Sequence, residues 1–167
     1  MATSLMTHFR MLARYNTIVN QRLYEAVALL DDEEYRRERA ASFRGIHQTL
    51  NHILLGDLVW MGRFTGTRNS TTPPLADELY ADFPSLRAAR IAEDARIEDF
   101  LANAGEDFLA SEVRYVNSKG AQRADPAGLA LAHMFNHQTH HRGQVHVMLS
   151  QTAVPPPSLD MHWAILP

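Results

Sequence analysis

Apolar residues recur at steps of three and four positions along most of this 167-residue chain. In the first segment they are Leu5, Phe9, Leu12, Val19, Leu23, Val27 and Leu30. This spacing places apolar side chains on one face of an α-helix, because a helix has about 3.6 residues per turn. Such a face has to be buried against another element, and the same period continues in later segments. The pattern therefore predicts an all-α fold.

Three more helices are expected from capping residues and apolar positions. The second follows Ser42, a good N-cap, and covers 43–64, a segment that is apolar on most sides. The third begins after Asp82, and its expected inner face consists of Leu86, Ala89, Ile97, Phe100 and Leu101. The last covers 126–152, with Asp125 as the expected cap and a proline in its first turn.

The segments between these helices contain charged or turn-forming residues. The stretch DDEEYRRER after the first helix is expected to be a solvated connection, and TGTRNSTTPP is expected to be a loop. Ahead of the last helix, Val113 and Tyr115 alternate with charged residues before NSKG, which predicts a short hairpin or an irregular crossover. No linker separates two parts. We therefore expect one domain, 1–167, folded as a four-helix bundle.

Composition excludes several classes of protein. The chain has no cysteine, so it has no disulfide, no thiolate metal ligand and no cysteine nucleophile. Its net charge is -3 and it has no basic stripe, which argues against a nucleic-acid partner. No apolar run reaches the roughly 18 residues of a membrane span, and MATSLMTHFRML does not resemble a signal peptide. We expect a cytoplasmic protein without a membrane partner.

Histidines are concentrated in FNHQTHHRGQVHVML, within the last expected helix. His137 and His141 are four positions apart, so they share a helix face and could converge on one metal ion. Gln138 occupies the position at which zincin helices carry a glutamate base, so that base is missing. His133 extends the same face, but it lies roughly 12 Å from His141 along the axis. That is too far to share an ion with bonds of about 2.0–2.1 Å.

A third ligand must come from another helix, and the second helix offers His47 and His52. The two are five positions apart and cannot share a face. His52 lies near the middle of its helix, so it lies at the same height as the middle of the last helix whether the two helices pack parallel or antiparallel. His47 lies near the start of its helix. We therefore expect His52 in the site and His47 as a partly exposed polar residue. Spacing alone leaves open the alternative of ordinary hydrogen-bonded histidines.

Three segments, ARYNTIVNQRLYEAV, GIHQTLNHILLGDLVWMGRFTG and LAHMFNHQTHHRGQVHVMLSQ, resemble the corresponding parts of the DinB-like (DinB/YfiT) family of metalloenzymes. The resemblance covers most of the chain, and NHQTHHRGQVH together with LNHIL is its most specific part. It implies a four-helix bundle with up-down-down-up topology, often as a homodimer. It also implies a three-histidine metal site, in which the ligands are His52, His137 and His141.

The resemblance further implies a function. A divalent ion, zinc or nickel, would serve a metal-dependent enzyme of thiol-transferase or hydrolase type that acts on a small molecule, with an external low-molecular-weight thiol as a second cofactor. Gln144, Asn16 and Asn20 are candidates for supporting the site, and no catalytic residue is assigned. The alternatives are a non-catalytic metal-binding or small-molecule-binding dimer, and a structural helical dimer with incidental histidines.

Overall fold

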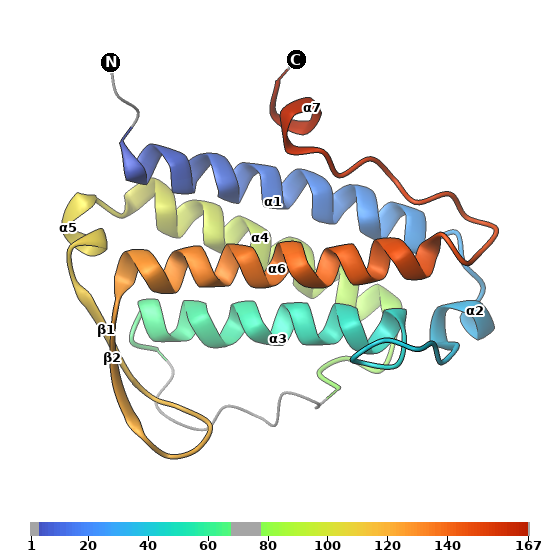
Figure 1. Ribbon diagram of the computed structural model, residues 1–167, viewed down its shortest axis with the longest axis horizontal. Coiled ribbons are helices and arrows are strands. Elements are labelled where there is room, and N and C mark those ends of the chain that lie inside the picture. Colours follow the sequence, from blue (N-terminus) through green and yellow to red (C-terminus); the bar gives the residue numbers. More distant parts are fainter. Residues whose placement is uncertain (1–3, 68–77, 167) are drawn as a thin grey trace.

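The computed structural model describes residues 4–67 and 78–166. Four long helices that pack along one another form its body (Figure 1). The four are α1 (Leu5–Val27), α3 (Ile46–Phe64), α4 (Phe83–Asn103) and α6 (Ala127–Leu149). In Figure 1, α1 and α6 run in one direction and α3 and α4 in the other, which is the up-down-down-up order. The predicted all-α, four-helix bundle is confirmed.

The connections follow from this topology. Because α3 and α4 are parallel, the end of α3 and the start of α4 lie at opposite ends of the bundle. The expected loop TGTRNSTTPP covers 65–74, and its residues 68–74 lie outside the described residues. α3 packs mainly against α6, and α1 packs mainly against α4.

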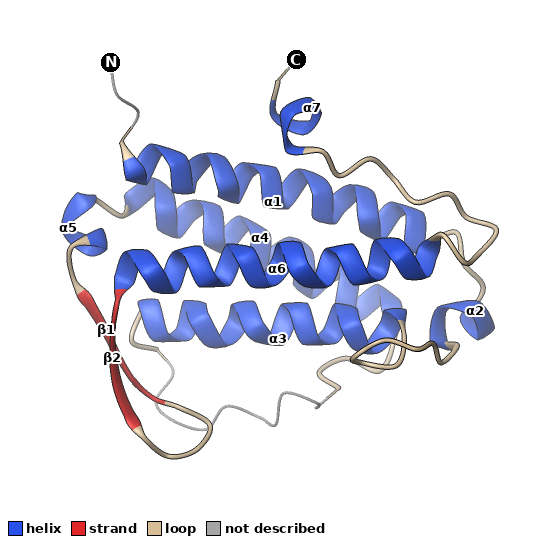
Figure 2. Ribbon diagram, in the orientation of Figure 1, coloured by secondary structure: helices blue, strands red, loops and turns tan. Residues whose placement is uncertain are grey.

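Short elements complete the fold (Figure 2). They are α2 (Asp32–Arg36), α5 (Glu106–Leu109), α7 (Met161–Ile165), β1 (Glu112–Val116) and β2 (Gln122–Pro126). The strands pair antiparallel, with Val113 opposite Asp125, so the predicted hairpin is confirmed. In its turn, the Asn117 side chain accepts hydrogen bonds from the backbone N–H groups of Lys119 and Ala121, and Gly120 takes a φ of 78°.

Two expectations about the first half are wrong. The charged segment is not simply solvated, because it contains α2, whose Tyr35 is only 4% exposed. Nor does Ser42 cap the next helix, since α3 begins at Ile46 with Gly45 at the N-cap position. Backbone hydrogen bonds among residues 39–44 fold the segment before α3 into a turn that includes Ser42.

The start of α6 also differs from expectation. Asp125 belongs to β2, where its carboxylate accepts hydrogen bonds from Tyr115 and Arg123 instead of capping the helix. The strand therefore continues through Pro126, and α6 begins one residue later. The helix ends at Leu149, earlier than the expected end at Thr152.

The core is divided into two apolar clusters. One includes Leu23, Leu50 and Val145, and the other includes Phe9, Met61 and Leu131. Between them, each long helix buries polar residues near its midpoint. These are Asn16 and Asn20 on α1, His52 and Asp57 on α3, Arg90 and Asp94 on α4, and Gln138, His141 and Arg142 on α6. We call this set the central polar layer.

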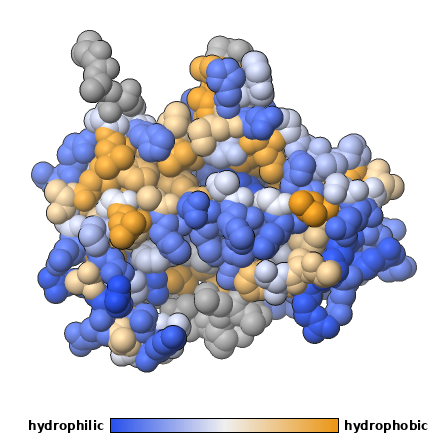
Figure 3. All heavy atoms as spheres, viewed as in Figure 1, coloured by the Kyte–Doolittle hydropathy of each residue, from blue (hydrophilic) through white to orange (hydrophobic). Residues whose placement is uncertain are grey.

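The outer face of α6 carries mainly hydrophilic side chains, as the middle of Figure 3 shows. Its exposed large apolar residues, Leu129 and Val147, lie near opposite ends of the helix. Among the described residues, no helix combines the length and the apolar character required to cross a membrane.

Candidate metal centre

Three histidines from two adjacent helices converge at the level of the central polar layer, which includes two of them. His52 on α3 and His137 and His141 on α6 each offer a ring nitrogen, and these nitrogens all lie within 4.8 Å of one another. The Nε2 atoms of His52 and His137 are 2.9 Å apart. Two nitrogens that bind one ion at about 2.0–2.1 Å are themselves about 2.9–3.4 Å apart. The same distance would also suit a hydrogen bond between the two imidazole rings. The feature that indicates a metal site is therefore the third imidazole, which converges on this pair.

The structure places the other histidines outside this cluster. His133 is exposed and packs its ring edge-on against Trp60, with ring centroids 5.3 Å apart. His47 is fully buried, so the expectation that it is partly exposed is wrong. Its Nδ1 lies 2.6 Å from the Tyr35 hydroxyl and its Nε2 lies 3.0 Å from the Glu78 carboxylate. The packing of α2 over the start of α3 buries it.

Burial favours the neutral form of the two clustered imidazoles on α6. Desolvation is the largest cause that lowers the pKa of His137, and together with the neighbouring His141 and His52 it brings that pKa to about 3. Desolvation also lowers the pKa of His141, although its hydrogen bond with Gln144 opposes the change. Neutral imidazole is the form that donates a lone pair to a metal ion. Protons therefore compete weakly for these nitrogens near neutral pH.

Two neighbours hold the rings in place. The Nδ1 atom of His141 lies 2.8 Å from the Gln144 amide oxygen, so Nδ1 donates a proton to that oxygen. The lone pair is then on Nε2, and a hydrogen bond of this kind orients a ligand histidine in metal sites. Phe43 stacks on His52, with ring centroids 3.8 Å apart. The sequence analysis missed Phe43, which lies ahead of the helix, and only its aromatic character could have drawn attention to it.

The backbone of α3 allows His137 to approach because residue 56 is glycine. A Cβ atom on Gly56 would lie 2.8 Å from Cε1 and 3.1 Å from Nδ1 of the His137 ring. The missing side chain at residue 56 therefore leaves the space that the His137 ring occupies.

Replacing Gly56 by alanine is expected to weaken the binding of a divalent ion by about tenfold or more, because misplacing a ligand imidazole costs about 10–100-fold in affinity. The free energy of unfolding of the metal-free protein should fall by less than the binding free energy does, since alanine favours a helix over glycine by about 0.5–1 kcal/mol. Chelator-competition titration measures the first effect and thermal unfolding the second. Gly143→Ala is the matched control, because a Cβ there meets no atom within 4 Å. Equal affinities in the two variants would contradict the prediction.

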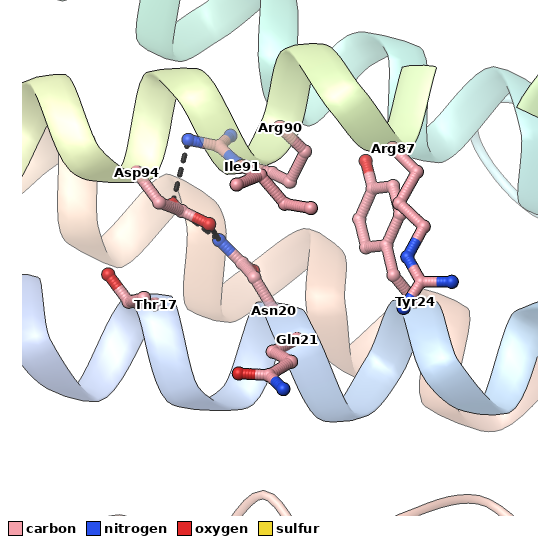
Figure 4. A pocket seen from close by; sticks show the side chains of 8 residues that line it. All are labelled: Thr17, Asn20, Gln21, Tyr24, Arg87, Arg90, Ile91 and Asp94. Atoms are coloured by element: carbon pink, nitrogen blue, oxygen red, sulfur yellow. Dashed lines mark hydrogen bonds and ion pairs between the residues drawn. The ribbon is translucent and has the colours of Figure 1, made fainter. Parts of the chain in front are cut away.

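Beside the histidines lies a buried network of charges and amides, and the sequence analysis named its asparagines but not its ion pairs. Arg90 forms ion pairs with Asp57, at 2.5 Å, and with Asp94, at 2.9 Å. The Asn20 amide donates to Asp94, as Figure 4 shows beside the Arg90–Asp94 pair. Burial raises the pKa of both aspartates, and the charge of Arg90 opposes that shift.

Asn16 and Asn20 connect this network to α6. Both amide groups donate to Asp94, and both amide oxygens accept hydrogen bonds from the Arg142 guanidinium. The two asparagines thus reach the interior, but their hydrogen bonds are with Arg142, Asp94 and, for Asn20, Gln138, and not with the three clustered histidines. Arg142 directly follows His141 in the sequence, so the network restrains the rotation of α6 that aims the histidines. The sequence feature that could have revealed this network is the set of charged residues near the middle of otherwise apolar helices.

A cavity borders the histidine cluster. It has a volume of about 210 Å³ and is lined by His52, Gly56, Val59, Trp60, Arg63, Ser118, His133 and His137. The site thus combines three imidazole nitrogen donors with space for a small molecule. Imidazole-only donor sets suit zinc, nickel, copper and iron, so the described residues fit a divalent transition metal.

The chain is similar to known proteins over most of its length. The model of the DinB family matches residues 1–166. Over 150 residues, the chain is 29% identical to protein DinB from Bacillus subtilis (strain 168), a stretch that covers 84% of this chain and 83% of that protein.

Proposed function

From the premise that this chain belongs to the DinB family, we propose that it is a divalent-metal-dependent enzyme of thiol-transferase or hydrolase type that acts on a small molecule. The observation that carries the proposal is the convergence of His52, His137 and His141 beside a cavity. Three neutral ligands leave at least one coordination position of a four-coordinate ion open. Structural zinc sites are normally closed by four protein ligands, so an open position favours chemistry.

When bound, a divalent ion in such a site acts as a Lewis acid that lowers the pKa of water or of a thiol and polarises a carbonyl group. The residues of the chain have separate tasks. Gln144 holds the proton of His141 on Nδ1, Phe43 shields one face of His52 from solvent, and Trp60 provides an aromatic wall for the substrate. Because the chain lacks cysteine, a reacting thiol would be an external molecule. We propose zinc or nickel as the native ion.

The experiment compares metal-free protein with protein reloaded with zinc or nickel, using an untagged chain. Two reactions are followed, the addition of a small thiol to an electrophile and the hydrolysis of an activated ester. Turnover that requires the ion and is lost in His52→Ala supports the proposal. Stoichiometric ion binding without turnover in either reaction would favour the alternative, a non-catalytic metal-binding bundle. Failure to take up any divalent ion would exclude both.

A further inference from the structure

The cavity beside the histidines extends along α3 towards the hairpin. His52 and His137 border one part of it, and Arg63 and Ser118, the latter in the hairpin turn, border another. Arg63 lies eleven positions after His52 on the same helix, which is about 16 Å between their Cα atoms along the axis. A long arginine side chain on a helix leans back towards the N-terminus and so shortens this gap. The lining therefore has a metal-facing part and an arginine-facing part.

Aromatic contacts hold Arg63 in this position. Its Cζ atom lies 4.5 Å from the Trp60 ring centroid and 3.9 Å from the Tyr115 ring centroid. Guanidinium groups that stack on rings keep their N–H donors in the plane of the group, where they can bind a carboxylate through two hydrogen bonds. Arg63 is close enough to Asp125 for their charges to interact, but that carboxylate also accepts hydrogen bonds from Tyr115 and Arg123.

The charge of the cavity differs from that of the whole chain. The net charge of the chain is -3, yet none of the described residues that line the cavity is acidic. Its ionisable side chains are Arg63, His52, His133 and His137. A divalent ion on the histidines would add positive charge in the metal-facing part. Clefts lined by one sign of charge concentrate ligands of the opposite sign.

The size of the cavity limits the ligand. A volume of about 210 Å³ corresponds to about seven water molecules, each of which occupies about 30 Å³. A ligand of this size can reach both parts of the cavity with a short chain. Val59 and Trp60 lie on the cavity wall along α3, between Gly56 and Arg63 in sequence, and suit an apolar middle portion.

Building on the proposed function, we infer that the substrate or thiol is a small anion with a metal-binding atom at one end and a carboxylate at the other, and that Arg63 binds the carboxylate. Ser118 provides a second hydrogen-bond donor, and Trp60 contacts the apolar chain between the two ends.

The test measures binding, not turnover, in the full-length chain loaded with Co²⁺. Absorption changes on thiolate coordination report the affinities of 4-mercaptobutyrate and of 4-mercapto-1-butanol, which share a thiol and a four-carbon chain and differ in charge. We expect the wild type to prefer the acid by about tenfold, or about 1.4 kcal/mol. Arg63→Met should reduce the preference to about twofold or less, Ser118→Ala should reduce it by about threefold, and Arg63→Lys should keep part of it. Arg114→Met is the matched control. Arg114 is an exposed arginine in the hairpin that also contains Ser118, and it does not line the cavity.

The outcomes separate the two proposals. If Co²⁺ binds but the wild type binds both thiols equally, or if Arg63→Met keeps the preference, the inference is overturned and the metal site stands. If Co²⁺ does not bind to the wild type, the proposed function and the inference fail together, at the first titration. A circular-dichroism melt checks that each variant is folded. Should Arg63→Met unfold, Ser118→Ala and Arg63→Lys decide, and an unchanged preference in Ser118→Ala would then overturn the inference.

Discussion

Replacing His137 by alanine is expected to abolish stoichiometric binding of a divalent ion, with a loss of affinity greater than about 100-fold. Changes to residues that only orient a ligand already cost about 10–100-fold, and His137 is itself one of three converging donors. It is also the ring whose Nε2 lies 2.9 Å from that of His52, so its loss leaves only two of the three converging donors. The measurement is metal content by mass spectrometry on untagged protein, followed by titration with zinc and nickel in the presence of a competing chelator.

The matched control for this variant is His133→Ala. His133 precedes His137 by one turn on α6 and is exposed, with its ring against Trp60. The His133→Ala variant should therefore keep the ion content of the wild type. Thermal unfolding adds a second readout, since an ion that binds only the folded state raises the melting temperature of the wild type and of His133→Ala, but not of His137→Ala. The metal site would be disproved if His137→Ala bound the ion as tightly as the wild type.

Replacing Arg90 by leucine is expected to lower the free energy of unfolding by about 3–5 kcal/mol, the usual cost of removing one partner from a buried ion pair. Arg90 is 2% exposed and pairs with Asp57 on α3 and Asp94 on α4. Without it, two buried carboxylates lose their cation, and Asp94 keeps only the hydrogen bonds from its asparagine neighbours. Chemical denaturation monitored by circular dichroism measures the change.

Two further variants show whether burial is the cause. Arg37→Leu removes the ion pairs that this exposed arginine forms with Glu33 and Glu34 and should change stability by less than about 1 kcal/mol. The double variant Arg90→Leu/Asp57→Leu should be more stable than Arg90→Leu alone, because it also removes a carboxylate that would otherwise be buried without a partner. A cost below about 1 kcal/mol for Arg90→Leu would show that water or other groups already compensate these charges.

Local patterns in the sequence determined the helical class and part of the site. The three- and four-residue period of α1, the capping by Asp82 at the start of α4 and the turn residues of the hairpin each act over a few positions, so they could be recognised without the fold. The pairing of His137 with His141 follows from helix geometry in the same way. Placing His52 at their level needed only the helix lengths, because two packed helices align their midpoints in either direction.

The tertiary structure decided which polar residues meet. Asp57, Arg90 and Arg142 are far apart in sequence, and nothing in the local pattern pairs a charge on one helix with a charge on another. The contact of Gly56 with the His137 ring, the stacking of Phe43 on His52 and the burial of His47 under α2 likewise depend on which faces touch. A helix repeats every 3.6 residues whatever surrounds it, whereas burial and charge pairing depend on distances that exist only once the four helices have packed.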